Sequence, residues 1–196
     1  MAVITKRRVI LKSRLAVAAI LLPVLYGLIG FLSPFLFFLF ATAAILTAQY
    51  EFYRLYYRNG SPAIFLALIL GFLLLCRFYF AFPLSFELLV SAILMILLIF
   101  QLFFFRNIQA SLLDSSVLFI GIFYLAGFLG HIIAIRQRPD GIGFIFFLLF
   151  VVWGGDAGAY YTGRSIGGKK LYPAVSPNKT VSGAIGGLLT LSLIHI

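Results

Sequence analysis

A run of 36 consecutive residues without a formal charge lies between Arg14 and Glu51, and it constrains this chain more than any other feature. An apolar helix needs about 20 residues to cross the hydrocarbon core of a bilayer, with a range of about 17–25. The apolar run from Leu15 to Ala48 is therefore too long for one crossing and just long enough for two. Ser33 and Pro34 lie near its middle, where we expect the turn of a helical hairpin.

Composition excludes the other broad classes of protein. Hydrophobic residues make up 63% of the 196 residues and charged residues only 10%, whereas soluble domains carry roughly 25% charged residues. These values exclude a soluble fold and a disordered chain, and the single cysteine, Cys76, excludes a disulfide scaffold. The basic start followed by an apolar run also resembles a signal peptide, but no clear cleavage site follows at the expected distance.

Further apolar runs predict an all-α fold, a polytopic transmembrane helix bundle with about six complete spans and the start of a seventh. After the first hairpin, the expected spans are Pro62–Cys76, Phe86–Phe105, Ser111–Ile135 and Gly141–Gly163, and the seventh begins near Gly183. We divide the chain into a basic N-terminus, residues 1–14, and a transmembrane domain, residues 15–196.

The basic residues orient these spans, because cytoplasmic segments of membrane proteins carry an excess of Lys and Arg. If the N-terminus is cytoplasmic, alternating spans place 12 of the 15 Lys and Arg residues on that side. The sequence therefore predicts an integral, multi-pass membrane protein whose N-terminus and loop of about residues 164–182 are cytoplasmic, in the inner membrane if the source is bacterial. This distribution accounts for the net charge of +10 without a nucleic-acid partner.

Asp156 is the ionisable residue that the apolar runs explain least. It lies seven residues before Gly163, which places it about 10 Å inside the end of a helical span. A carboxylate at that depth is costly and usually faces a polar cavity. We interpret Asp156 mainly as a metal ligand, with a structural salt bridge as the alternative, and we expect Tyr160 on the same helix face.

Small residues surround Asp156 at four-residue spacing. Gly154 and Gly158 form one such series, and Gly155, Ala159 and Gly163 form a second. This pattern is typical of a helix face that packs closely against another helix.

The loop that follows combines positive charge with glycine and proline. Its basic residues are Arg164, Lys169, Lys170 and Lys179. Such side chains neutralise phosphate groups, and glycines let a backbone approach them closely; the alternative is that the basic residues anchor the chain at lipid headgroups. The segment Ser176-Pro177-Asn178-Lys179-Thr180 precedes Gly183, where the next helix is expected to begin, and a helix N-terminus favours anions.

Short motifs span residues 153–187: Trp153-Gly-Gly-Asp156, Ala159-Tyr160, Gly163-Arg164 with Gly167, Ser176-Pro-Asn-Lys-Thr180 and Gly183-Ala-Ile-Gly-Gly187. In combination they resemble the phosphatidate cytidylyltransferase family, also called CDP-diacylglycerol synthases. The resemblance implies that a cytidylyl group passes from CTP to phosphatidate, giving CDP-diacylglycerol and pyrophosphate. It also implies a Mg²⁺ cofactor, with a second cation expected, and a homodimer is a further possibility.

The resemblance assigns roles to the motif residues. Asp156 would hold magnesium and, with Lys179, act in catalysis. The expected substrate-binding residues are Arg164, Lys169, Lys170, Ser176, Pro177, Asn178, Thr180 and Gly183.

Two departures from the family leave alternatives open. Family members usually carry Glu where this chain has Ser182, and a later acidic and basic segment that completes their metal site does not occur before Ile196. We therefore expect a C-terminally truncated member, assign His195 no role, and keep two alternatives. One is an inactive fragment of the transferase, and the other is an ion-coupled transporter with Asp156 as its ion site.

Overall fold

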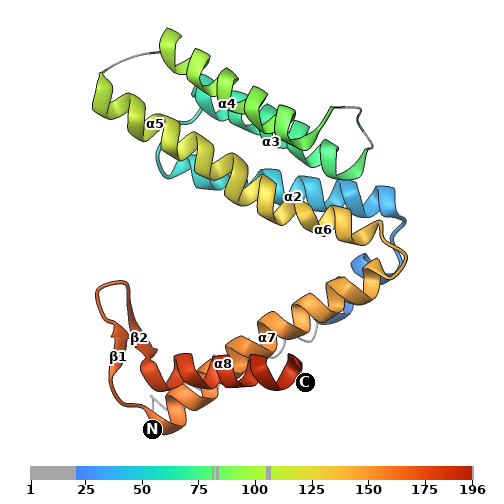
Figure 1. Ribbon diagram of the computed structural model, residues 1–196, viewed down its shortest axis with the longest axis vertical. Coiled ribbons are helices and arrows are strands. Elements are labelled where there is room, and N and C mark those ends of the chain that lie inside the picture. The colour runs from blue at the N-terminus through green and yellow to red at the C-terminus, as the bar shows by residue number, and fades with distance from the viewer. Residues whose placement is uncertain (1–20, 81, 83, 105–106, 196) are drawn as a thin grey trace, which may run out of the picture. The chain divides into compact units, whose positions relative to one another are not determined.

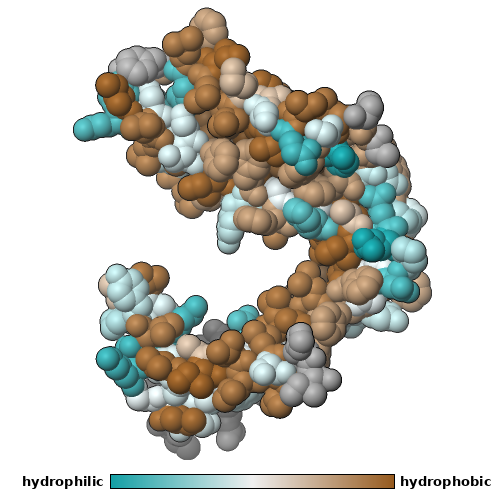
Figure 2. Space-filling view, in the orientation of Figure 1, coloured by the Kyte–Doolittle hydropathy of each residue, from teal (hydrophilic) through white to brown (hydrophobic). Residues whose placement is uncertain are grey.

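The computed structural model describes residues 21–80, 82, 84–104 and 107–195, and the chain divides into two compact units, Met1–Pro139 and Asp140–Ile196 (Figure 1). Within the described part, five helical stretches are long and apolar enough to cross a membrane. Large apolar side chains on these helices are exposed, and they cover much of the face that Figure 2 shows. Such surfaces belong in lipid, so the chain is a multi-pass membrane protein.

The first unit contains the helices α2 (Pro34–Arg54), α3 (Pro62–Tyr79), α4 (Phe86–Phe103) and α5 (Ile108–Ile120), then a π-helical segment η1 (Gly121–Phe128) that continues into α6 (Leu129–Arg136). A shorter apolar helix, Leu21–Gly30, precedes them. The predicted hairpin turn is confirmed at Ser33, whose hydroxyl accepts a hydrogen bond from the backbone N–H of Leu36 and caps α2. The start of the first predicted span lies outside the described residues.

Buried polar groups join three helices in the core of this unit. The side-chain amide of Gln49 donates to the backbone oxygen of Ala67 at 3.0 Å and to the hydroxyl of Tyr53 at 3.2 Å. The Tyr53 hydroxyl in turn donates to the backbone oxygen of Leu118 at 3.0 Å, just before α5 gives way to η1. The ring of Tyr53 occupies the space that a Cβ atom on Gly121 would need, so glycine permits this contact.

The second unit consists of α7 (Gly141–Ile166), an antiparallel hairpin of β1 (Lys170–Tyr172) and β2 (Ser176–Thr180), and α8 (Val181–His195). The all-α prediction therefore holds for the helices, and this short hairpin is the exception (Figure 1).

Two approximate boundaries in this unit shift by two or three residues in the structure. The helix α7 continues through Arg164 to Ile166 and ends at Gly167, whose φ of +64° suits glycine. The helix α8 begins at Val181 and not at Gly183, because Thr180 supplies the N-terminal cap described below. The connecting segment is thus shorter than the predicted loop at 164–182, and part of it forms the hairpin.

Candidate functional site

The face of α7 that carries small residues packs against α8, as predicted. A Cβ atom added at Gly183 would lie 2.8 Å from the backbone oxygen of Ala159, and one added at Gly187 would lie 3.0 Å from the Cβ atom of Ala159. A Cβ atom at Gly155 would lie 3.0 Å from the side chain of Leu191. The glycines therefore let the two helix backbones approach closely.

The neighbouring face of α7 carries Asp156, Tyr160 and Arg164 at four-residue spacing. All three side chains are exposed within this unit. The guanidinium of Arg164 donates a hydrogen bond of 2.9 Å to the Tyr160 hydroxyl and lies 6.0 Å from the centre of its ring. The predicted shared face of Asp156 and Tyr160 is confirmed by this spacing on one continuous helix.

The longer helix changes the predicted depth of Asp156. Asp156 lies ten positions before Ile166, the last residue of α7, so it is about 15 Å from that helix end and not 10 Å. None of the described residues forms a hydrogen bond or ion pair with its carboxylate. On the α7 face that carries Asp156, Tyr160 and Arg164, the Asp156 carboxylate is therefore available to an external cation or hydrogen-bond donor.

The donor set for a metal is small in the part of the chain that the structure describes. No group of three or more His, Cys, Asp or Glu side chains comes together there. Mg²⁺ commonly takes only one or two carboxylates and completes its octahedron with water and substrate phosphates. Asp156 fits this use as a single carboxylate ligand.

The start of α8 is fixed by side chains from the Ser176–Thr180 motif and its neighbours. Thr180 is buried, and its hydroxyl accepts a hydrogen bond of 3.1 Å from the backbone N–H of Gly183, as an N-cap residue does. The Ser182 hydroxyl donates to the backbone oxygen of Gly167 at 2.5 Å and lies 3.1 Å from the Thr180 hydroxyl. The backbone N–H of Val181 donates to the backbone oxygen of Lys169 at 3.0 Å.

These bonds bear on the predicted roles of Thr180 and Gly183. Both were expected to bind phosphate, yet each already has a partner within the cap. Their phosphate contacts stay a prediction, and the structure adds a second use for both residues. It also gives Ser182 a function, since its hydroxyl ties the Gly167 turn to α8.

The remaining predicted residues are presented to solvent on or beside the hairpin. Lys169, Lys170 and Lys179 are exposed, as are Pro177 and Asn178, and Ser176 is half-buried. Lys170 pairs with Thr180 across the hairpin and Tyr172 pairs with Ser176, with an irregularity between the two pairs. One short element thus gathers three ammonium groups beside the end of α7, which suits a polyanionic ligand.

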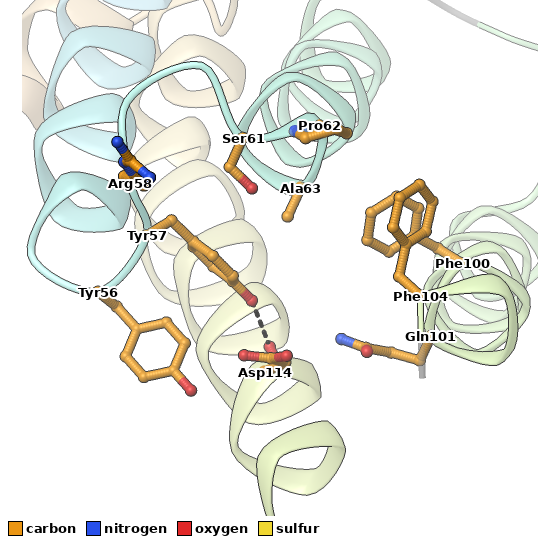
Figure 3. A pocket seen from close by; sticks show the side chains of 10 residues that line it. All are labelled: Tyr56, Tyr57, Arg58, Ser61, Pro62, Ala63, Phe100, Gln101, Phe104 and Asp114. Carbon is orange, nitrogen blue, oxygen red and sulfur yellow. Dashed lines mark hydrogen bonds between the residues drawn. The ribbon is translucent and has the colours of Figure 1, made fainter. Parts of the chain in front are cut away.

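Sequence reasoning assigned no role to Asp114, which lies in the other unit. Its side chain is only 5% exposed, and it lines a pocket with Tyr57, Arg58 and Gln101 (Figure 3). The available signal was a lone acidic residue within an otherwise apolar span, which usually marks a polar cavity.

The fold is that of a multi-pass membrane protein, and its hairpin region carries exposed lysines beside the end of α7. The model of the cytidylyltransferase family matches residues 12–196, so the chain belongs to that family.

Two curated relatives illustrate the similarity. A phosphatidate cytidylyltransferase of Staphylococcus saprophyticus is 37% identical over 86 residues, which are 44% of this chain and 32% of that protein. One of Brucella suis is 51% identical over 69 residues, 34% of this chain and 25% of that protein. The chain thus matches about a third or less of the length of these relatives.

Proposed function

We propose that this chain takes part in the transfer of a cytidylyl group from CTP to phosphatidate, giving CDP-diacylglycerol and pyrophosphate. One observation carries the proposal: a chain of the cytidylyltransferase family places Asp156, Arg164 and an exposed lysine-bearing hairpin in one compact unit. The names of the matched relatives supply the substrate class.

The reaction joins two anions, so charge neutralisation is its main requirement. A phosphate oxygen of phosphatidate attacks the α-phosphorus of CTP, and the bond from that phosphorus to the bridging oxygen breaks as pyrophosphate leaves. Such transfers depend on positioning and on stabilising charge at the phosphoryl oxygens. We assign Lys179 and Arg164 to the phosphates of CTP, with Lys169 and Lys170 contributing to the same positive field.

The neutral residues of the motif would orient the phosphates. The Ser176 hydroxyl and the Asn178 amide are hydrogen-bond donors in the same strand as Lys179, and Pro177 stiffens the strand between them. The Arg164–Tyr160 hydrogen bond holds the guanidinium on the Asp156 face of α7.

Magnesium is the cofactor that this assignment requires, and a second cation is compatible with it. When bound, Mg²⁺ neutralises phosphate oxygens and aligns the reacting groups. Asp156 would hold it with one carboxylate, and the substrate phosphates would supply further oxygens.

The sidedness of the site is part of the proposal. An excess of Lys and Arg marks cytoplasmic segments, so the N-terminus and the hairpin would face the cytoplasm, where they meet CTP. Phosphatidate would reach the same hairpin from the adjoining leaflet.

The test measures how fast label from CTP enters lipid in membranes that contain this chain and added phosphatidate. We expect Asp156→Asn to lower the magnesium-dependent rate at least about a hundredfold, because it removes the charged ligand. Asp140→Asn is the matched control, since Asp140 lies at the other end of α7. Full magnesium-dependent activity of the Asp156→Asn variant would refute the assignment.

A further inference from the structure

The hairpin of the second unit starts and ends at the surface of the bilayer. The helix α7 has 26 residues and is therefore about 39 Å long. The hydrocarbon core is about 30 Å thick, and the bilayer with its headgroups is about 40–45 Å thick. A span that begins after Asp140 at one surface thus ends, at Ile166, among the headgroups of the other leaflet. The hairpin and the start of α8 follow at that level.

Hydrogen bonds hold the base of the hairpin at this level. The backbone N–H of Val181 donates to the backbone oxygen of Lys169 at 3.0 Å, and the Ser182 hydroxyl donates to that of Gly167 at 2.5 Å. In Figure 1 the two strands turn aside from the end of α7 and do not continue along its axis. A hairpin in this position runs along the membrane surface instead of projecting into water.

The turn of the hairpin is apolar and exposed. Leu171 is 50% exposed, Tyr172 61% and Val175 75%. The backbone N–H of Val175 donates to the backbone oxygen of Tyr172 at 3.2 Å, which closes a β-turn with Pro173 at its second position. Apolar side chains that gather on a surface beside polar residues mark contact with a protein or a membrane.

Positive charge lies on both strands beside this turn. Lys169 and Lys170 precede the turn, Lys179 follows it, and all three side chains are exposed. Residues 167–182 include no acidic side chain that would neutralise them. Lysine lays its apolar stem along apolar surroundings and keeps its ammonium group at the headgroups, where anionic lipids attract it.

A lipid leaflet accounts for both features of the hairpin with one partner. Its headgroup layer is already present at the end of α7, so no separate protein has to be recruited. Tyrosine favours this layer because its ring is apolar and its hydroxyl is polar. Apolar side chains flanked by lysines match the order of acyl chains and phosphates in an anionic leaflet.

We propose that the hairpin is an interfacial anchor, which binds the anionic leaflet at the C-terminal end of α7. The side chains of Leu171, Tyr172 and Val175 enter the boundary between headgroups and acyl chains. The ammonium groups of Lys169 and Lys170 contact lipid phosphates, and the backbone of the turn stays among the headgroups, within reach of water. The anchor is a contact with the bilayer and does not depend on cytidylyl transfer.

Spin-label accessibility in lipid nanodiscs tests the anchor. Val175→Cys carries a nitroxide, and the unsubstituted chain, whose Cys76 is buried, gives the background. Power saturation compares collisions with oxygen, which concentrates among acyl chains, and with a water-soluble nickel complex. In bilayers rich in anionic glycerol lipid, we expect the oxygen-to-nickel ratio at position 175 to be at least about fivefold that at Asn59→Cys. Asn59 is an exposed residue of the α2–α3 connection.

The charge of the leaflet is varied next. In bilayers of choline lipid alone, we expect the ratio at position 175 to fall at least about twofold, because the lysines lose their anionic partners. The double substitution Lys169→Gln with Lys170→Gln should lower the ratio similarly in anionic bilayers. Lys6→Gln with Lys12→Gln makes the same change of charge near the N-terminus and should leave the ratio unchanged.

The apolar contribution has its own variant and control. Leu171→Asn, added to the labelled Val175→Cys chain, should lower the oxygen-to-nickel ratio because a polar amide enters the acyl boundary less readily. Leu55→Asn changes the same residue type at an 86% exposed position in the other unit and should leave the ratio unchanged.

Three results would overturn the proposal. They are equal ratios at positions 175 and 59, equal ratios at position 175 in anionic and choline bilayers, and an unchanged ratio in the Leu171→Asn variant. The assay contains neither CTP nor magnesium, so its failure would leave the proposed cytidylyl transfer standing. Absence of that transfer would likewise not alter the ratio.

Discussion

At the scale of single residues, hydroxyl groups determine where backbones meet in this protein. Tyr53 connects α2 to the carbonyl of Leu118, and Thr180 and Ser182 fix the start of α8. The sequence indicated Thr180 as part of a phosphate motif because of its neighbours. Its use as a helix cap depends on where α8 begins, and that boundary could not be read from an apolar run alone.

Tyr53→Phe tests the buried network of the first unit. The substitution removes the donor to the Leu118 carbonyl and one partner of Gln49, so we expect a loss of about 1–3 kcal/mol in the free energy of unfolding. Denaturant titration in mixed micelles measures this loss. Tyr50→Phe is the control, because the Tyr50 side chain is exposed; equal losses in both variants would contradict the network.

Thr180 offers a second test at this scale. Thr180→Val removes the cap and should cost about 1 kcal/mol, whereas Thr180→Asp retains a capping oxygen and should keep most of that stability. Hydrogen exchange of the first amides of α8 measures both effects. Similar exchange rates in the two variants would show that the hydroxyl does not cap the helix.

At the scale of elements, helices were predictable and the hairpin was not. Uninterrupted apolar runs identified α3, α4 and α7, because each is long enough to cross a bilayer. The strands β1 and β2 are short, and β2 contains Pro177, so no alternating pattern indicated them. Bonds from Val181 and Ser182 to the backbone on the other side of the hairpin hold it in place.

Close packing of α7 on α8 gives the prediction that belongs to this scale. Gly183→Ala should destabilise the pair by about 1–3 kcal/mol, because the new methyl group would meet the backbone oxygen of Ala159 at 2.8 Å. Amide hydrogen exchange across both helices reports the loss. Gly143→Ala, in α7 with nothing within 4 Å of the added atom, should be neutral or slightly stabilising. A neutral Gly183→Ala would disprove the close approach.

At the scale of the whole molecule, the spacing of apolar helices and the distribution of basic residues predict a topology. The sequence alone allows this prediction because hydrocarbon thickness and the charge bias act on composition. It could not supply the pocket around Gln101, because that site combines four segments that are distant in the chain.

Cysteine accessibility tests the topology directly. Ala174→Cys in the hairpin turn and Gln137→Cys after α6 introduce exposed thiols, while the native Cys76 is buried. We expect a membrane-impermeant maleimide to label position 174 only in inside-out vesicles and position 137 only in right-side-out vesicles. Labelling of both positions from one side would contradict the proposed orientation.

The most direct measurement of the central claim is the protection of Lys179 from amine modification by CTP. With Mg²⁺ and CTP present, we expect Lys179 to be acetylated at least about tenfold more slowly, because its ammonium group would contact phosphate. The N-terminal lysines Lys6 and Lys12 serve as internal references, and Asp156→Asn should abolish the dependence on Mg²⁺. An unchanged acetylation rate of Lys179 at saturating CTP would contradict a nucleotide site at this hairpin and, with it, the proposed cytidylyl transfer.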